Sequence, residues 1–343
     1  MSDTFGKILT LTTFGESHGP AIGGVLSGMP AGIHIDTEAI RLQMQRRRPG
    51  QSPLTTARAE ADEVEILSGV FNGVTTGTAI GLLIRNTNQR SGDYGEIEHT
   101  YRPGHADYTY DARYGIRDYR GGGRASARET AVRVAAGAIV RQWLEQKGIE
   151  IHARIAAIGG IENDAAGDAL NEVCSQVVLD AKGAGDSVGG IVECVVTGLP
   201  SGIGNPPFGK LQSGLAAAMM SIPAAKGFEY GMGFDGSRRH GSEVIDTWVP
   251  DPDDPRGMHA AANNSGGIQG GISNGEPIVM RVAFKPTATM LRDVETCDDR
   301  GNAVTLHARG RHDPCVAIRA VAVVEAMAAL TVADAVLCSN HQL

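Results

Sequence analysis

The sequence lacks several features that would point to particular protein classes. Its five cysteines are odd in number, widely spaced and include no CxxC pair, which argues against a disulfide framework or a zinc site. The first ten residues, MSDTFGKILT, contain no basic segment followed by an apolar stretch, and the most apolar region, residues 317–337, is interrupted by Arg319, Glu325 and Asp334. We therefore expect a cytoplasmic protein that binds no metal and is not inserted in a membrane.

Lysine and aromatic residues are also scarce. The 31 basic residues comprise 25 arginines and 6 lysines, aromatic residues make up 5% of the chain, and the net charge is −8. Nucleic-acid binding needs a broad basic face, and single-stranded RNA is commonly bound by stacking on aromatic rings. We therefore expect no nucleic-acid partner, although an arginine-rich RNA-binding module remains a rival hypothesis.

Glycine and clustered arginine are abundant instead. There are 46 glycines among 343 residues, well above the roughly 7% of an average protein. Arg46, Arg47 and Arg48 are adjacent, and seven more arginines fall between residues 102 and 133. Genomic base composition explains the number of arginines better than function does. Their clustering favours a site for small anions, because the planar guanidinium group binds carboxylates and phosphates bidentately.

The chain repeats three patterns in the same order, about half its length apart. Residues 23–33 resemble residues 192–203, each containing G-[ML]-P-[AS]-G-I; residues 69–80 resemble 267–278; and residues 123–133 resemble 310–319 more weakly. Chance would more readily give one short match. We predict a single domain, residues 1–343, built of two similar halves, about 1–150 and 151–343.

Apolar patterns predict the main elements. Residues 128–147 and 316–337 are predicted to be long buried helices, and residues 64–71, 78–84, 188–196 and 277–284 to be strands. Glycine-rich turns join the strands, which favours antiparallel or mixed sheets over a doubly wound parallel sheet. The predicted class is α+β, a β-α-β sandwich with central long helices between two largely antiparallel sheets and an internal pseudo-two-fold duplication.

Two histidine motifs lie in the first half. GESHG, residues 15–19, places Ser17 and His18 between glycines that allow the backbone to approach a ligand closely; a solvated loop histidine is the alternative. In YRPGHADYTY, residues 101–110, a Pro-Gly turn brings Arg102 and His105 together, as a phosphate site would need. A surface turn with a solvated arginine explains this second motif equally well.

The other motifs are ambiguous by themselves. RRRPG, residues 46–50, ends a helix that starts near Asp36, where basic side chains favour the helix dipole. YRGGGRASARE, residues 119–129, is a glycine-rich loop opening a helix, an arrangement that favours anions. In GRHDPC, residues 310–315, Asp313 precedes a proline, and helix N-capping is its simplest interpretation.

Taken together, GESHG, RRRPG, RPGHAD, RGGGRASARET, KPT and GRHDPC occur in an order that resembles the chorismate synthases, from about residue 5 to 337. The resemblance implies a sandwich fold with internal pseudo-symmetry, usually a homotetramer, and reduced FMN as cofactor. It implies the anti-1,4-elimination of phosphate from 5-enolpyruvylshikimate 3-phosphate, giving chorismate without net oxidation. NADPH, acting on this chain's flavin or through a separate flavin reductase, is the implied source of electrons.

The resemblance also implies residue roles. His18 would protonate the departing phosphate, His105 would manage protonation at the flavin, and Asp313 would relay the ring proton. Implied substrate-binding residues are Ser17, Arg47, Arg48, Arg102 and Arg128. Implied flavin contacts are Arg124, Ala125, Ser126, Ala224, Gly270, Lys285, Pro286, Thr287, Ala288, Thr289 and Arg311.

Three positions depart from the usual family pattern. Ala125 stands where serine is commoner, Pro223 replaces an asparagine, and Pro53 occupies a position where many members have arginine. Pro223 cannot donate a backbone hydrogen bond to a flavin, and Pro53 weakens any nicotinamide contact expected there. A phosphate-handling lyase or phosphatase that works without flavin is the rival enzyme hypothesis.

Overall fold

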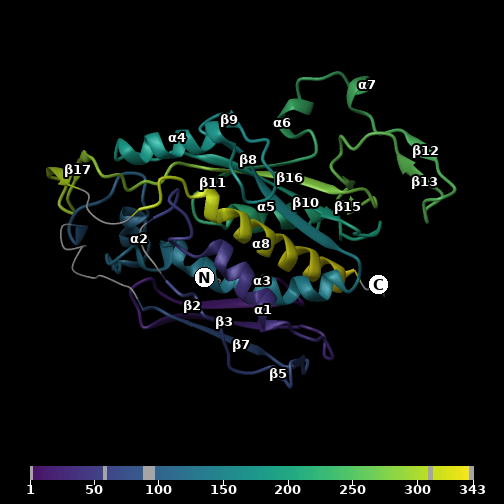
Figure 1. Ribbon diagram of the computed structural model, residues 1–343, viewed down its shortest axis with the longest axis horizontal. Helices are drawn as coiled ribbons and strands as arrows, with labels where there is room; N and C mark the ends of the chain where they lie inside the picture. The colour runs from purple at the N-terminus through teal and green to yellow at the C-terminus, as the bar shows by residue number, and fades with distance from the viewer. Residues whose placement is uncertain (1–2, 57–59, 88–96, 308–311, 340–343) are drawn as a thin grey trace.

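The computed structural model describes residues 3–56, 60–87, 97–307 and 312–339, which form two antiparallel sheets with helices between them (Figure 1). The first sheet has the strand order β1-β2-β3-β7-β4 and the second the order β9-β8-β10-β16-β11. The strands of the first sheet are β1 (Thr4–Phe5), β2 (Thr10–Gly15), β3 (Ala21–Ser27), β7 (Ile80–Arg85) and β4 (Glu65–Ile66). Those of the second are β9 (Ile161–Glu162), β8 (Glu150–Ile158), β10 (Gly190–Thr197), β16 (Ile278–Phe284) and β11 (Ala225–Tyr230).

Four helices fill the space between the sheets. They are α1 (Thr37–Arg47), α3 (Thr130–Glu145), α5 (Leu211–Met220) and α8 (Ala317–Cys338). Asp36 caps α1 by accepting a hydrogen bond from the Glu38 amide, so this helix begins where the sequence predicted. The α+β class and the layered arrangement of antiparallel sheets around long helices are thereby confirmed.

The same succession of elements occurs twice along the chain. In each sheet three long strands are neighbours, β2-β3-β7 in one and β8-β10-β16 in the other, and an edge strand, β4 or β11, pairs with the third. A helix and a short hairpin separate the second strand from the third: α1 with β5 (Val70–Phe71) and β6 (Val74–Thr75), and α5 with β14 (Ile268–Gln269) and β15 (Ile272–Ser273). The predicted boundary near residue 150 falls at β8, where the second succession begins.

One predicted strand is wrong. Residues 64–71 form two separate two-residue strands, β4 and β5, rather than one. Between them Ser68 pairs through its side chain, its hydroxyl donating to the Ala79 carbonyl at 2.9 Å and accepting from the Gly81 amide at 3.0 Å. This side-chain pairing replaces backbone ladder bonds, so the chain leaves the sheet there.

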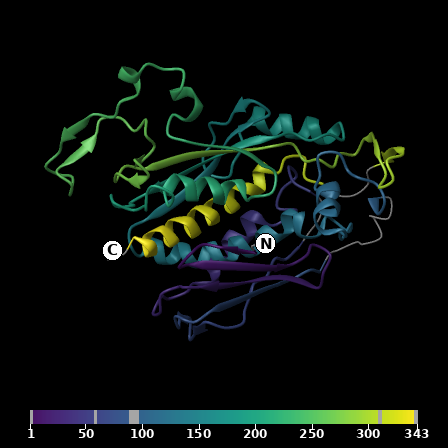
Figure 2. The same cartoon turned by 180° about the vertical axis from the view of Figure 1, so that it is seen from behind.

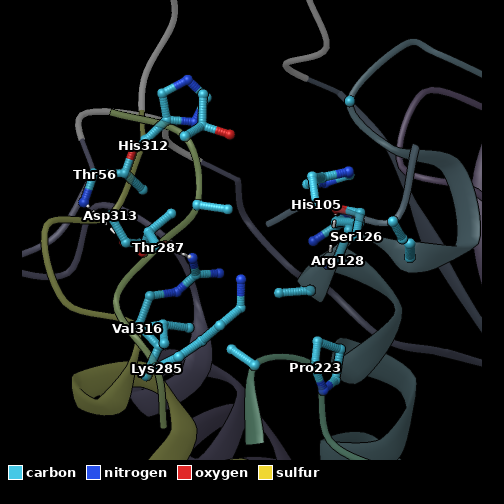
Figure 3. Close-up of a pocket in the computed structure, with 18 of the residues that line it drawn as sticks. Thr56, His105, Ser126, Arg128, Pro223, Lys285, Thr287, His312, Asp313 and Val316 are labelled. Atoms are coloured by element: carbon cyan, nitrogen blue, oxygen red, sulfur yellow. Dashed lines mark hydrogen bonds and ion pairs between the residues drawn. The ribbon is translucent and has the colours of Figure 1, made fainter. Parts of the chain in front are cut away.

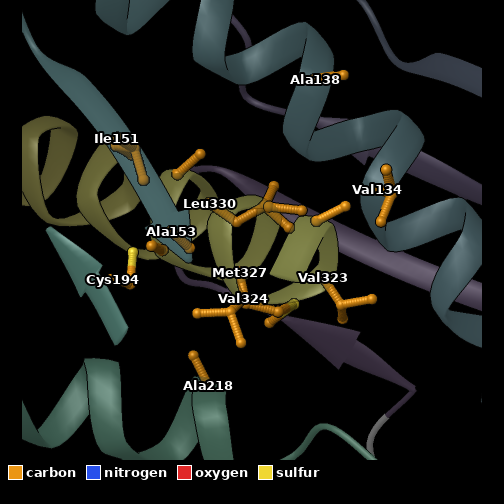
Figure 4. Packing of buried hydrophobic residues seen from close by; sticks show 14 of the residues in the cluster. Val134, Ala138, Ile151, Ala153, Cys194, Ala218, Val323, Val324, Met327 and Leu330 are labelled. Atoms are coloured by element: carbon orange, nitrogen blue, oxygen red, sulfur yellow. The ribbon is translucent and has the colours of Figure 1, made fainter. Parts of the chain in front are cut away.

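The core is centred on the crossing of α3 and α8 (Figure 4). A Cβ atom on Gly137 would lie 2.4 Å from Cβ of Ala326, so the two helices approach as closely as their backbones allow. Glu325 is buried in the otherwise apolar α8 and is paired with Arg46 at 2.5 Å and Arg141 at 3.0 Å. Among the described residues α8 is the one helix long and apolar enough to cross a membrane, but 78% of its most apolar window is buried inside the protein.

Two long connections lie at one end of the sandwich. The first connection, residues 86–129, joins β7 to α3 and contains α2 (Asp107–Tyr114) and two 3₁₀ turns, η2 (Gly123–Ala125) and η3 (Ala127–Glu129). The second connection, residues 285–316, joins β16 to α8 and contains the hairpin β17 (Asp293–Cys297) and β18 (Ala303–His307).

The second half also carries insertions. Helix α4 (Glu172–Gly183) packs on β8 and β9. The segment holding α6 (Gly233–Gly236), α7 (Gly241–Val244) and the hairpin β12 (Trp248–Pro250) and β13 (Met258–Ala260) projects from the sandwich in both views (Figures 1 and 2).

Candidate active site

A cavity of about 410 Å³ lies where the two connections meet. This volume is within the range of small-molecule sites. In Figure 3 Lys285, Thr287 and Asp313 of the second connection form one wall, and His105, Ser126 and Arg128 of the first connection face them. The two walls also touch directly, because the Lys285 ammonium donates to the Gly104 carbonyl at 2.6 Å. The cavity therefore depends on both halves of the chain.

Most of the residues predicted from the sequence line this cavity. They are His18, His105, Asp313, Arg47, Arg102, Arg128, Ala125, Ser126, Ala224, Lys285, Pro286, Thr287, Ala288 and Thr289. Their positions along the chain run from His18 to Asp313, which takes in most of its length. The fold thus brings together motifs whose joint function could only be inferred from their order in the sequence.

The remaining predicted residues lie elsewhere. Ser17 is buried behind His18, and Arg48 is the half-buried C-terminal cap of α1. Arg124 faces a neighbouring hollow on the other side of the glycine loop, where it donates to Thr13 Oγ at 2.7 Å, and Gly270 lines a separate hollow beside Phe228 and Tyr230. Arg311 lies outside the described residues.

His18 is held in the turn between β2 and β3. His18 is 6% exposed, and its Nδ1 lies 3.0 Å from the Ser17 hydroxyl. The same edge of the ring packs against Gly121, where an added Cβ would be 2.1 Å from Cε1 of His18. A solvated loop histidine was the alternative interpretation, and the burial of this ring is inconsistent with it.

The glycine loop of RGGGR packs against both histidines. Gly121, Gly122 and Gly123 all have positive φ angles, 64°, 88° and 53°. A Cβ on Gly122 would lie 2.8 Å from Cε1 of His105, just as one on Gly121 would collide with His18. The positive φ angles disfavour any other residue at all three positions, and at Gly121 and Gly122 there is also no room for a side chain. The sequence suggested an anion-binding loop, but its contact with the two imidazoles was not foreseen.

His105 belongs to a buried charged cluster centred on Asp107. The Asp107 carboxylate accepts from Nε and NH2 of Arg102, both at 2.8 Å, and lies 3.0 Å from Nδ1 of His105. Burial alone would raise the pKa of Asp107, but the bonds from Arg102 and His105 outweigh it and hold the pKa well below its usual value. Asp107 is therefore an anion that orients both site residues.

The same cluster sets the protonation of His105. Burial lowers its pKa below the usual 6.5, the hydrogen bond to Asp107 opposes this, and the charge of Arg102 lowers it further. The ring is thus largely neutral at pH 7. With a proton on Nδ1 donated to Asp107, Nε2 remains the basic nitrogen.

A second buried carboxylate, Asp62, joins Arg47 to Arg128. Its side chain is fully buried, accepts from NH1 of Arg47 at 2.6 Å and forms a close ion pair with NH1 of Arg128. Burial would raise the pKa of Asp62, but the two guanidinium charges outweigh it and keep the pKa lowered. Burial lowers the pKa of Arg47 to about 10, which still leaves it charged at neutral pH. Sequence reasoning missed Asp62, because an isolated aspartate in a polar stretch gives no signal of its partners.

Asp313 does not cap a helix, so the simplest interpretation of its motif is wrong. Helix α8 begins at Ala317 without a side-chain cap. The Asp313 carboxylate instead accepts from the Thr56 amide at 3.0 Å and from NH1 of Arg319 at 2.5 Å. Arg319, which also lines the cavity, is a second site residue that the sequence did not reveal. Its partnership fixes Asp313 at the cavity wall.

The cavity is strongly cationic. Among the described residues that line it, four arginines (Arg47, Arg102, Arg128 and Arg319) and Lys285 accompany a single carboxylate, Asp313. The pKa of Lys285 is lowered by burial and by repulsion from Lys226. Groups of three or more possible metal ligands are absent from the part of the chain that is described. The arrangement suits a ligand with several negative charges.

The chain is similar to known proteins over nearly its whole length. The family model described as chorismate synthase matches residues 9–337. The chain is 51% identical over 355 residues to a chorismate synthase of Sphingopyxis alaskensis, covering 99% of both chains, and 52% identical over 360 residues to one of Synechococcus sp. strain WH7803, covering 100% and 99%. A solved structure titled "Crystal Structure of Chorismate Synthase" superposes with a TM-score of 0.73 and 32% identity, covering 97% of this chain and 92% of that one.

These likenesses run through both halves and include the strands, helices and connections that form the cavity. Identity near 50% over almost the full length far exceeds what a shared fold alone would require. The chain belongs to the chorismate synthase family.

Proposed function

We propose that this chain catalyses the anti-1,4-elimination of phosphate from 5-enolpyruvylshikimate 3-phosphate, giving chorismate, with reduced FMN bound beside the substrate. The observation that carries the proposal is the cationic cavity, which is lined by His18 and His105 of the first half and by the Asp313 carboxylate of the second. Figure 3 shows His105 opposite Asp313. Such a substrate has two carboxylates and a phosphate. Three anionic groups match the surplus of guanidinium and ammonium groups on the walls.

The arginines of the cavity are proposed to bind these anions in fixed orientations. Arg102 and Arg128 are both oriented by buried carboxylates, Asp107 and Asp62. A guanidinium that is already held in place loses little side-chain entropy when a substrate binds, so the free energy of substrate binding is more favourable. The substrate-binding roles proposed for Ser17 and Arg48 are indirect in this geometry, because neither residue is among those that line the cavity.

The cavity also has groups that fit a flavin. Residues 285–289 form a continuous stretch of its wall. The Thr287 hydroxyl is buried and has no hydrogen-bond partner among the described residues, which is unusual unless a bound group supplies one. When bound, reduced FMN is proposed to lend electron density that assists phosphate loss and to recover it as the ring proton departs. Ala125, Ser126 and Ala224, which also line the cavity, would complete the contacts.

The protein's own groups then handle two protons. His18 is proposed to protonate the departing phosphate, since its ring is fixed by Ser17 and Gly121 at the cavity edge. Asp313 is proposed to relay the ring proton, because its carboxylate is held by the Thr56 amide and Arg319 on the opposite wall. His105, neutral and hydrogen-bonded to Asp107, would exchange a proton with the flavin.

The test is an anaerobic assay of the purified chain with 5-enolpyruvylshikimate 3-phosphate and chemically reduced FMN. We expect equal amounts of chorismate and phosphate, and none of either when flavin is omitted. Phosphate release in air without flavin would instead identify a phosphatase or a flavin-free lyase. Retention on RNA that weakens steeply with salt, without turnover, would favour the nucleic-acid hypothesis.

The remaining expectations from the family are proposals of the same kind. They are a homotetramer, a cytoplasmic location, and electrons that come ultimately from NADPH, directly or through a separate flavin reductase. Replacing reduced FMN by oxidised FMN plus NADPH in the same anaerobic assay distinguishes the two routes. Turnover by the chain alone would assign the reductase activity to it.

A further inference from the structure

We propose that Asn86 is a positioning residue, which holds the His18 turn and the Arg128 guanidinium in one fixed geometry. This inference rests on the proposed function, because His18 and Arg128 are the groups it would place. Asn86 does not line the cavity. It stands immediately after β7, one residue beyond the pairing of Ala21 with Arg85.

The side chain of Asn86 makes three hydrogen bonds of two kinds. Its amide group donates to the Glu16 carbonyl at 2.9 Å and to the Gly19 carbonyl at 2.8 Å, the two carbonyls that flank Ser17 and His18. Its Oδ1 accepts from Nε of Arg128 at 2.8 Å. One planar amide therefore links the turn that carries the proposed acid to a proposed substrate-binding arginine.

The surrounding backbone strengthens this link. The backbone amide of Asn86 donates to the Pro20 carbonyl at 3.1 Å, and the backbone carbonyl of Arg85 accepts from Nη2 of Arg128 at 3.2 Å. NH1 of Arg128 is held by Asp62, so Asn86 and Asp62 fix different nitrogens of the same guanidinium. Only an amide side chain supplies two donors and one acceptor at this point. Aspartate could still accept from Arg128 but could not donate to the two carbonyls.

The chain contains a matched control far from the cavity. Asn163 has the same hydrogen-bond pattern: its side-chain amide donates to the Ile155 and Ala169 carbonyls at 2.9 and 3.0 Å, and its Oδ1 accepts from the Asn171 amide at 2.8 Å. Its backbone amide donates to the Ala156 carbonyl at 2.8 Å, as that of Asn86 does to Pro20. Asn163→Asp removes the same donors without touching His18 or Arg128.

The experiment compares steady-state kinetics of Asn86→Asp, Asn86→Ala and Asn163→Asp in the anaerobic assay with reduced FMN. For Asn86→Asp we expect kcat to fall about 30-fold while KM for the phosphate substrate changes by less than about 3-fold, because the Arg128 contact survives. For Asn86→Ala we expect a similar fall in kcat and a rise in KM of about 10-fold. Asn163→Asp should leave both constants within about 3-fold of the parent.

A second readout requires no turnover. In the unliganded protein labelled with ¹³C at histidine Cε1, the His18 signal is identified by its loss in His18→Gln. Asn86→Ala, which introduces no charge, should change the chemical shift and the titration midpoint of that signal, whereas Asn163→Asp should change neither.

Equal kinetic losses in Asn86→Asp and Asn163→Asp, or an unchanged His18 signal in Asn86→Ala, would overturn the inference. A parent protein without lyase activity would overturn the proposed function instead, and the NMR comparison would still decide whether Asn86 positions His18.

Discussion

The two connections occupy the same place in the two halves, between the third long strand and the long core helix, yet they differ in chemistry. The first contributes His105, Arg102 and a glycine loop that packs on His18, and buried Asp107 and Asp62 hold its arginines Arg102 and Arg128 in place. The second contributes Lys285, the buried Thr287 hydroxyl and Asp313. The repeated elements supply the framework, and the divergence of the two connections supplies complementary walls of one cavity.

The largest expected effect tests whether the first connection and the turn beside it supply the proposed acid. His18→Ala should lower kcat about 10³-fold, because removing a positioned general acid typically costs this much. The free energy of unfolding should change little by comparison. Steady-state assays with reduced FMN measure kcat, and urea unfolding measures the free energy of unfolding. Exposed His152, which pairs with Glu150 on the surface of β8, gives the control His152→Ala. Similar kcat values in both variants would contradict the assignment.

The next effect concerns the buried carboxylates behind the first wall. Asp62→Asn should lower the free energy of unfolding by about 3 kcal/mol, because it leaves two buried guanidinium groups without their shared counter-charge. Urea unfolding measures the change. Asp168→Asn breaks a partly exposed pair with Arg46 and should cost less than about 1 kcal/mol. If the two variants lost the same stability, Asp62 would not be the charge that organises this wall.

A smaller effect is expected on the second wall. Asp313→Asn should lower kcat about 10²-fold, because an amide cannot relay a proton. The free energy of unfolding should fall by only about 1 kcal/mol, because the amide oxygen can still accept hydrogen bonds from the Thr56 amide and Arg319. The control is Asp298→Asn, in the turn of the same connection, whose carboxylate also accepts backbone amides. Loss of activity matched by an equal loss of folded protein would instead indicate a structural role.

The smallest effect is a pH dependence of stability contributed by the first connection. The folded-state pKa of His105 lies below 6.5, so below that pH the unfolded chain binds a proton that the folded ring resists. Stability should therefore decline as pH falls from 7 toward the folded-state pKa. His105→Asn should flatten this part of the profile, measured by urea unfolding between pH 7 and 5. An unchanged slope would mean that other groups cause it.

Local patterns predicted the elements and much of the wall. The spacing of apolar residues placed the two long helices, and Asp36 marked the start of α1. Strand prediction failed at residues 64–71, where hydrogen bonds of the Ser68 side chain replace the backbone hydrogen bonds of a continuous strand. Asp313 was likewise misread, because the Asp-Pro pair has the form of a helix start.

Periodicity, composition and ordered motifs were enough to predict the class of fold, the duplication pattern and the residue types of the site. The partners of those residues emerged only once the chain was folded. Asp62 lies 66 residues from Arg128, and Asp313 lies 257 residues from Thr56. Asn86 lies 70 residues from Glu16. Hydrogen bonds and charges act over a few ångströms in space, so pairings of this kind are set by how the two halves pack rather than by any local pattern.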